Sequence, residues 1–288
     1  MRCTAGDDTR DGSFSMKVPP YFDYLIEGFR RGKTGRFVHL GYWDTGVKAA
    51  EVPQDDFGQA QRRLDQMLLH AAGLSDGQHI LDVGCGFGGT LESINSHFSG
   101  MRLAGVNVDP RQLQICRQLA SLNGNGLNWE QADACALPFA ADVFHRVLCI
   151  EAMFHFPSRR EFFSEAARVL KAGGALIGSD ITIIPSAKHL ESPTLRIKAT
   201  LQDSYGPWPD PWGEEGDHSA LAAAAGLRCT WVLDATAHTL ASHRFTAPAG
   251  ADVRHDNGHD PARRAALMLK RLHEEGLLRY LCFRFDKP

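Results

Sequence analysis

Apolar residues recur along the chain in a pattern that predicts alternating strands and helices. Short apolar runs predict strands, and apolar residues at helical spacing predict the helices between them. The predicted strands are 79–83, 103–108, 127–131, 144–150, 175–181, 228–233 and 278–285, and the predicted helices are 59–72, 89–98, 112–122, 159–170, 219–225 and 261–275. Strands that alternate with helices form a parallel sheet with helices on both faces. We therefore expect an α/β fold with a doubly wound, mostly parallel sheet of seven strands.

Three segments depart from this alternation. Residues 1–15 are polar and rich in glycine and aspartate, which predicts a disordered tail. Residues 16–58 hold aromatic side chains near helical spacing and predict a helical cap on the main domain, residues 59–288. Residues 185–217 contain five prolines, and we expect them to form a lid inserted after the fifth strand.

The composition excludes several classes of protein. Of the 288 residues 43% are hydrophobic and 23% charged, and the formal net charge is −3, so the chain lacks the basic surplus that binding to nucleic acid needs. Seven scattered cysteines form no Cys-x-x-Cys pair, and we expect no metal site. Without a signal-peptide core or a run of ~18 apolar residues, we expect a cytoplasmic protein with no membrane span. A homodimer is compatible with the sequence.

A glycine-rich turn follows the first predicted strand. Gly84, Gly86 and Gly89 match the pattern G-x-G-x-x-G, which lets a ligand approach the start of a helix. Asp82 lies two positions before the first glycine, where its carboxylate would repel a pyrophosphate and attract an ammonium group. S-adenosylmethionine carries an ammonium, a carboxylate and a sulfonium. The turn therefore favours this cofactor over a nicotinamide dinucleotide, which stays as the alternative.

Other motifs follow the turn in order, and together they resemble a known family. They are the segments 39–44 (HLGYWD), 105–112 (GVNVDPRQ), 131–139 (QADACALPF) and 168–174 (RVLKAGG). With residues 82–88 they resemble class I S-adenosylmethionine-dependent methyltransferases, in the branch that methylates sugars, polyketides, sterols and quinones. The resemblance extends from about residue 36 to the C-terminus. It implies a Rossmann-like fold, with the segment 16–58 capping the cofactor.

The resemblance also implies which residues bind the cofactor. Gly84, Gly86 and Gly88 would line its methionine moiety, with Asp82 near the ammonium group. Asn107 stands where most members have an acidic residue that binds the ribose, and Val108 and Gln112 follow it. Asp133 would accept from the adenine amino group and the Ala134 N–H would bind a ring nitrogen. Tyr42 would close over the methionine end, and Glu151 is a further candidate contact.

The segment after the fourth predicted strand, Glu151–Pro157, is where the acceptor is expected to react. Resembling sugar and polyketide O-methyltransferases have two adjacent histidines here, with the base at the first, whereas this chain has Phe154 followed by His155. His155 is our candidate base, and the alternative is a histidine that only orders its loop. Asp180, at the end of the fifth strand, is a second catalytic candidate that could orient a histidine, bind the acceptor or act as a base.

The chemistry expected is methyl transfer to a hydroxyl of a small specialised metabolite. Several aromatic residues, Phe154, Phe156, Tyr205, Trp208 and Trp212, predict an acceptor that is apolar or aromatic in part. C-methylation of an alkene, isoprenoid or quinone is the close alternative, followed by N-methylation. A dehydrogenase and a non-catalytic cofactor-binding module are remote alternatives.

Overall fold

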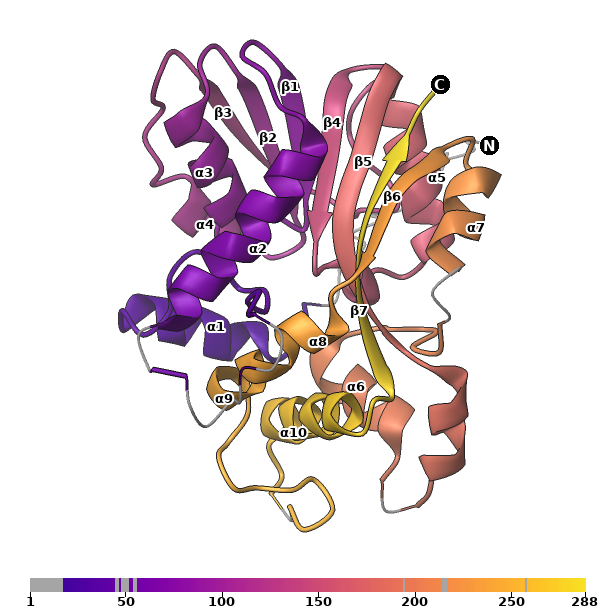
Figure 1. Ribbon diagram of the computed structural model, residues 1–288. Coiled ribbons are helices and arrows are strands. Elements are labelled where there is room, and N and C mark those ends of the chain that lie inside the picture. Colours follow the sequence, from indigo (N-terminus) through magenta and orange to yellow (C-terminus); the bar gives the residue numbers. More distant parts are fainter. Residues whose placement is uncertain are drawn as a thin grey trace, which may run out of the picture.

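Seven strands form one central sheet in the computed structural model, which describes residues 18–44, 47, 52–53, 56–193, 195–213, 217–256 and 258–288 (Figure 1). The strands are β1 (His79–Val83), β2 (Arg102–Asn107), β3 (Gly126–Gln131), β4 (Phe144–Ile150), β5 (Leu170–Ile183), β6 (Arg228–Asp234) and β7 (Leu278–Asp286). Their order is β3-β2-β1-β4-β5-β7-β6, and β7 runs antiparallel to both of its neighbours. The predicted seven-stranded, mostly parallel sheet is confirmed.

Helices cover both faces of this sheet. One face packs against α2 (Phe57–Ala72), α3 (Gly89–His97) and α4 (Pro110–Cys116), and the other against α5 (Arg159–Val169) and α7 (Asp217–Ala224). Successive side chains of a strand point to opposite faces. Ile80 of β1 accordingly joins the apolar layer beneath α2, and Leu81 joins the layer beneath α5. The two layers bury the strands on both sides.

A second group of helices gathers at one end of the sheet, drawn below it in Figure 1. It comprises α1 (Phe22–Arg30), α6 (Ile197–Tyr205), α8 (Thr236–Thr239), α9 (His243–Thr246) and α10 (Pro261–Glu274), with the 3-10 turns η3 (Met153–His155), η4 (Pro185–Leu190) and η5 (Leu240–Ser242). α6 belongs to the segment predicted as a lid, and it packs against α10. The predicted tail, 1–15, lies outside the described residues. Within the part of the chain that the structure describes, no helix is long and apolar enough to cross a membrane.

The fourth helix is shorter than predicted, because α4 ends at Cys116 and the apolar spacing continues to Leu122. The Asn95 side chain explains the early end. Its Nδ2 donates to the carbonyl of Ala120 at 2.9 Å, and its Oδ1 accepts from the amide of Leu122 at 3.0 Å. An asparagine from α3 thus satisfies backbone groups that a longer helix would have paired internally.

Candidate active site

A cavity of about 560 Å³ opens where β1, β2 and β4 end. β2 and β3 follow β1 on one side of it in the sheet, and β4 pairs with β1 on the other side, so the strand order reverses at β1. The crevice at such a reversal of strand order is the usual ligand site of a doubly wound sheet. The predicted site residues that line the cavity are Gly84, Gly86, Asn107, Val108, Gln112, Asp133, Ala134, Glu151 and His155. Tyr42, Asp82, Gly88 and Asp180 do not line it.

The glycine turn forms the floor of the cavity. Gly84 has φ +78°, and a Cβ there would lie 2.4 Å from the Cβ of Ala152. Any side chain at residue 84 would therefore both strain the backbone and displace the segment that carries His155. Gly88 faces the core instead of the cavity, since its Cβ would meet the Trp129 ring at 3.0 Å. The role predicted for Gly88, lining the cofactor, does not fit this position.

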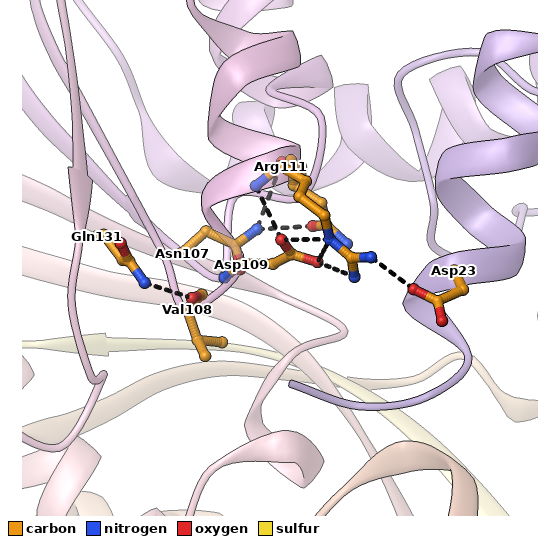
Figure 2. Close-up of polar contacts among 8 residues, drawn as sticks. Asp23, Asn107, Val108, Asp109, Arg111 and Gln131 are labelled. Atoms are coloured by element: carbon orange, nitrogen blue, oxygen red, sulfur yellow. Dashed lines mark hydrogen bonds and ion pairs between the residues drawn. The ribbon is translucent and has the colours of Figure 1, made fainter. Parts of the chain in front are cut away.

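Asn107 ends β2 at the wall of the cavity, and its side chain is fixed by its neighbours (Figure 2). Its Nδ2 donates to Oε1 of Gln112 at 2.7 Å, and its Oδ1 accepts from the amide of Asp109 at 3.3 Å. Gln131 of β3 donates to the carbonyl of Val108 at 3.1 Å. The wall is thus held in place from α4 and from β3.

Arg111 connects this wall to α1. It binds the buried carboxylate of Asp109 at 2.8 Å through Nη2 and reaches Asp23 of α1 at 2.7 Å through Nη1 (Figure 2). The Asp23 end of this bridge is exposed, so its contribution is modest, about 0.2–1 kcal/mol. Its effect is to place the start of α1 beside the cavity.

Asp133 follows β3 and presents one free carboxylate oxygen to the cavity. Its Oδ1 accepts from the amide of Cys135 at 2.8 Å, which closes a tight local turn. Because the backbone contact uses only this oxygen, Oδ2 stays available to a donor in the cavity. Ala132 and Ala134 line the cavity on either side of it.

Two carboxyl groups, the buried Asp82 and the half-buried Glu151, lie near the glycine turn. Burial and the like charge of Asp65 raise the pKa of Asp82 to about 8. Burial also raises the pKa of Glu151 to about 8, although Glu151 accepts from the amide of Leu40 at 2.8 Å. Glu151 has φ +52°, a strained conformation for a residue that is not glycine. Both groups would favour a cation nearby, because a positive charge would stabilise their ionised forms.

His155 points into the cavity, and Phe154 points away from it. Phe154 is buried and its ring lies 4.7 Å from that of Trp208. The Nε2 of His155 lies 2.8 Å from the Tyr21 hydroxyl, and its Nδ1 lies 2.6 Å from the Tyr205 carbonyl oxygen. Burial lowers the pKa of His155 to about 4, so its imidazole is neutral near pH 7.

A catalytic role for Asp180 does not fit its geometry. Its fully buried carboxylate accepts from Arg159 Nε at 2.6 Å and lies 2.9 Å from His218 Nε2. The carboxylate therefore neutralises a charge between α5 and α7, and it makes no contact with His155. We assign Asp180 a structural role.

A cofactor contact from Tyr42 does not fit either. The Tyr42 ring stacks on His238 at 4.3 Å, outside the cavity. The aromatic segment 39–44 contributes His39 to the cavity instead. His39 is buried, and its Nε2 has no hydrogen-bond partner in the described part of the chain.

Sequence reasoning missed the residues that α1 and the chain just before and after it contribute. Pro19, Tyr21, Phe22, Leu25 and Val38 all line the cavity. Their helical spacing predicted a cap, but spacing alone does not show which face of a cap meets the site. Within the described residues, no group of three or more His, Cys, Asp or Glu side chains could hold a metal ion.

Comparison with known proteins identifies the family. A sequence model described as a methyltransferase domain matches residues 81–178. Methyltransferase GfsG of Streptomyces halstedii is 34% identical over 245 residues, which cover 84% of this chain and 82% of that protein. The chain belongs to the methyltransferase family.

Two further similarities extend this result. Erythromycin 3''-O-methyltransferase of Saccharopolyspora erythraea is 34% identical over 149 residues. These cover 51% of this chain and 46% of that protein, so the chain matches about half the length of that relative. The crystal structure of mycolic acid cyclopropane synthase CmaA1, complexed with S-adenosylhomocysteine and CTAB, superposes with a TM-score of 0.70 at 19% identity. It covers 94% of this chain and 99% of that one, and it shows the shared fold.

The cofactor of the methyltransferase is S-adenosylmethionine, and the donors and acceptors of the cavity fit it. The free oxygen of Asp133 suits the adenine amino group, and Asn107 with Gln112 offers amide groups to ribose hydroxyls. The carboxyl of Glu151, which lines the cavity, suits the cationic methionine end, and the ionised form of Asp82, buried before the turn, would add negative charge nearby. At the turn, the side-chain-free Gly84 leaves the backbone open to close approach.

Proposed function

We propose that this methyltransferase methylates a hydroxyl group of a small specialised metabolite. The observation that carries the proposal is the position of His155, whose side chain lines the same cavity as Asn107 and Asp133. Bound S-adenosylmethionine supplies an electrophilic methyl group, so that the acceptor oxygen gains the methyl, the sulfonium becomes a neutral thioether, and one proton is released. A positioned base that takes this proton accelerates such reactions ~10²–10⁴-fold. The relative that methylates a 3''-hydroxyl of erythromycin supports an oxygen acceptor.

The residues of the cavity divide between the two ligands in this proposal. Asn107, Val108, Gln112, Asp133 and Ala134 bind the adenosine part of the cofactor. The glycine turn and Glu151 bind the methionine part, and Asp82, buried before the turn and not lining the cavity, acts on it through its charge.

The acceptor occupies the end of the cavity near His155. The Phe22 ring lies 5.7 Å from that of His155, and the cavity is further lined by the apolar Pro19, Leu25, Phe156, Pro157 and Pro207 and by the polar Gln202 and Asp203. A lining of this kind suits an acceptor that is apolar or aromatic in part and carries a few polar groups.

We also propose a reducing compartment, the cytoplasm, for the protein. Cys85, Cys116, Cys149 and Cys282 are buried free thiols. Such thiols persist where disulfides do not form.

The test is methyl transfer by the purified protein from S-adenosylmethionine carrying a labelled methyl group. The acceptor panel contains phenols, terpene alcohols, polyketide lactones and lactones bearing deoxysugars. A matched variant, His155→Gln, keeps a polar side chain of similar length but removes the base. We expect it to bind S-adenosylhomocysteine as the wild type does and to lose ~10²–10⁴-fold in kcat. Equal turnover in the two proteins, or transfer to carbon or nitrogen alone, would contradict the proposal.

A further inference from the structure

Both ring nitrogens of His155 are engaged by the protein, which determines its tautomer. A carbonyl oxygen can only accept a hydrogen bond, so Nδ1, 2.6 Å from the Tyr205 carbonyl, carries the ring proton. In the neutral ring Nε2 then carries no proton, and its lone pair can accept a hydrogen bond. The Tyr21 hydroxyl, 2.8 Å away, therefore donates its proton to Nε2. The lone pair through which His155 would act as a base therefore already accepts a hydrogen bond from the phenol of Tyr21.

Tyr21 lies beside His155 on the wall of the cavity. Tyr21 and His155 both line the cavity, and their rings stack with centroids 5.4 Å apart. The Tyr21 hydroxyl donates a hydrogen bond to His155, and the lone pairs of its oxygen stay available to accept a hydrogen bond from a ligand. A hydroxyl that approaches from the cavity can therefore hydrogen-bond to Tyr21 without displacing it.

The position of Tyr21 is set by the helix that it precedes. Phe22 and Ile26 of α1 are buried, and Asp23 pairs with Arg111 beside the cofactor wall (Figure 2). The Tyr24 hydroxyl is exposed, and its bond to Asp260 at 2.8 Å lies outside the cavity. The buried apolar face of α1 and the Asp23–Arg111 pair thus place Tyr21.

We propose that Tyr21 is a catalytic residue that relays the acceptor's proton to His155. This proposal rests on the proposed function. As the acceptor oxygen is methylated, its proton moves to the Tyr21 oxygen while the Tyr21 proton moves to Nε2 of His155. The O–H bond of the acceptor breaks, Tyr21 ends as a neutral phenol, and His155 ends as an imidazolium. The cavity keeps one positive charge, because the imidazolium gains the charge that the sulfonium loses.

The electrostatics require the two proton transfers to occur together. Burial, with Tyr205 and Glu151 nearby, raises the pKa of Tyr21 well above 10, so a free phenolate does not accumulate. The imidazolium, once formed, donates through Nδ1 to the Tyr205 carbonyl, whereas the charges of the Asp180–Arg159 pair act on it in opposite directions. Tyr205 is therefore a positioning residue through its backbone.

The first test is the ¹⁵N spectrum of the His155 ring in the complex with S-adenosylhomocysteine, without an acceptor. We expect the Nδ1–H tautomer, and in Tyr21→Phe a change in the Nε2 shift as its donor is lost. The control is Tyr24→Phe, which removes a hydroxyl three residues away and should leave the His155 signals in place. An Nε2–H tautomer, or an Nε2 shift that Tyr21→Phe does not change, overturns the proposal without any measurement of turnover.

The second test is turnover. We expect Tyr21→Phe to lose ~10²–10⁴-fold in kcat while it binds S-adenosylhomocysteine as the wild type does. We expect the double variant Tyr21→Phe/His155→Gln to lose no more than either single variant, because the two residues act as one unit. A kcat for Tyr21→Phe comparable to that of Tyr24→Phe overturns the relay and assigns proton removal to Nε2 directly. In mixtures of H₂O and D₂O the wild-type rate should depend non-linearly on the D₂O fraction, because two protons move in the same step. A linear dependence contradicts the relay.

Failure of the proposed function looks different. If the labelled methyl is found on carbon, hydroxyl methylation and the relay of an O–H proton are both wrong, while the ¹⁵N spectrum still reports whether Tyr21 donates to Nε2 of His155. If no acceptor is methylated, the ¹⁵N spectrum still tests the hydrogen bond from Tyr21 to Nε2 of His155, on which the relay depends.

Discussion

The buried carboxyl of Asp82 predicts that cofactor binding depends on pH. Its pKa is raised to about 8 in the protein without ligand, because burial and Asp65 disfavour the ionised form. The ammonium group of the cofactor favours that ionised form. Binding below pH 8 therefore requires Asp82 to lose its proton, and the free energy of this ionisation weakens the affinity.

The size of the effect follows from the pKa. At pH 6.5 ionising a group of pKa about 8 costs about 2 kcal/mol, since each pH unit below the pKa corresponds to 1.36 kcal/mol. Through Asp82 alone the affinity should therefore rise about 15-fold between pH 6.5 and pH 8, and Glu151, whose pKa is also about 8, adds to this rise. The same group makes the ligand-free protein less stable as the pH rises from its unfolded pKa of about 3.9 to about 8, because the folded state holds the proton more tightly in that window.

The assay is calorimetric titration with S-adenosylhomocysteine at several pH values, in buffers that differ in ionisation enthalpy. Asp82→Asn should weaken binding at pH 8 and flatten the pH dependence, and it should remove one released proton at pH 6.5. Asp142→Asn, a change at an exposed carboxylate paired with Lys287, is the control and should behave as the wild type. Binding to the wild type without proton release at pH 6.5, or an unchanged pH dependence in Asp82→Asn, would refute the reasoning.

Three further variants test separate parts of the account. Asp133→Ala should weaken S-adenosylhomocysteine binding by about 1.5–3 kcal/mol, the contribution of a hydrogen bond to a charged group, and unchanged affinity by calorimetry would exclude the adenine contact. Gly84→Ala should abolish binding because the new Cβ would lie 2.4 Å from that of Ala152, whereas wild-type affinity would show that the turn adapts. Asp180→Asn should lower the free energy of unfolding by about 3–5 kcal/mol, because Arg159 loses its buried partner. Denaturant unfolding measures this loss, and catalytic loss without destabilisation would restore a functional role to Asp180.

The sheet and the cofactor wall could be predicted from the sequence because their signals are local. Short apolar runs predict the strands, and motifs such as 82–88 and 105–112 contain both the strand end and the residues that follow it. Asn107, Gln112 and Asp133 therefore reach the cavity wherever the sheet forms. The early end of α4 was not predictable, because it depends on the Asn95 side chain of another helix.

The acceptor end of the cavity was harder to predict because residues far apart in the sequence build it. Tyr21 and His155 are separated by 134 positions and meet only after α1 has packed. The orientation of Phe154 and His155 was likewise open, since adjacent residues in a 3-10 turn point in different directions. Asp180 shows the opposite case: the sequence predicts a carboxylate at the end of the fifth strand, but β5 continues to Ile183, and Asp180 is paired with Arg159 and lies 2.9 Å from His218 Nε2.

The position of the transferred methyl group in the product shows directly whether the protein methylates oxygen. The purified protein is incubated with S-adenosylmethionine carrying a ¹³C-methyl group and with the acceptor found in the panel, and the product is examined by ¹³C NMR. The account predicts a single methyl signal at the shift of an oxygen-bound methyl, lost in His155→Gln. A methyl bound to carbon or nitrogen would contradict it.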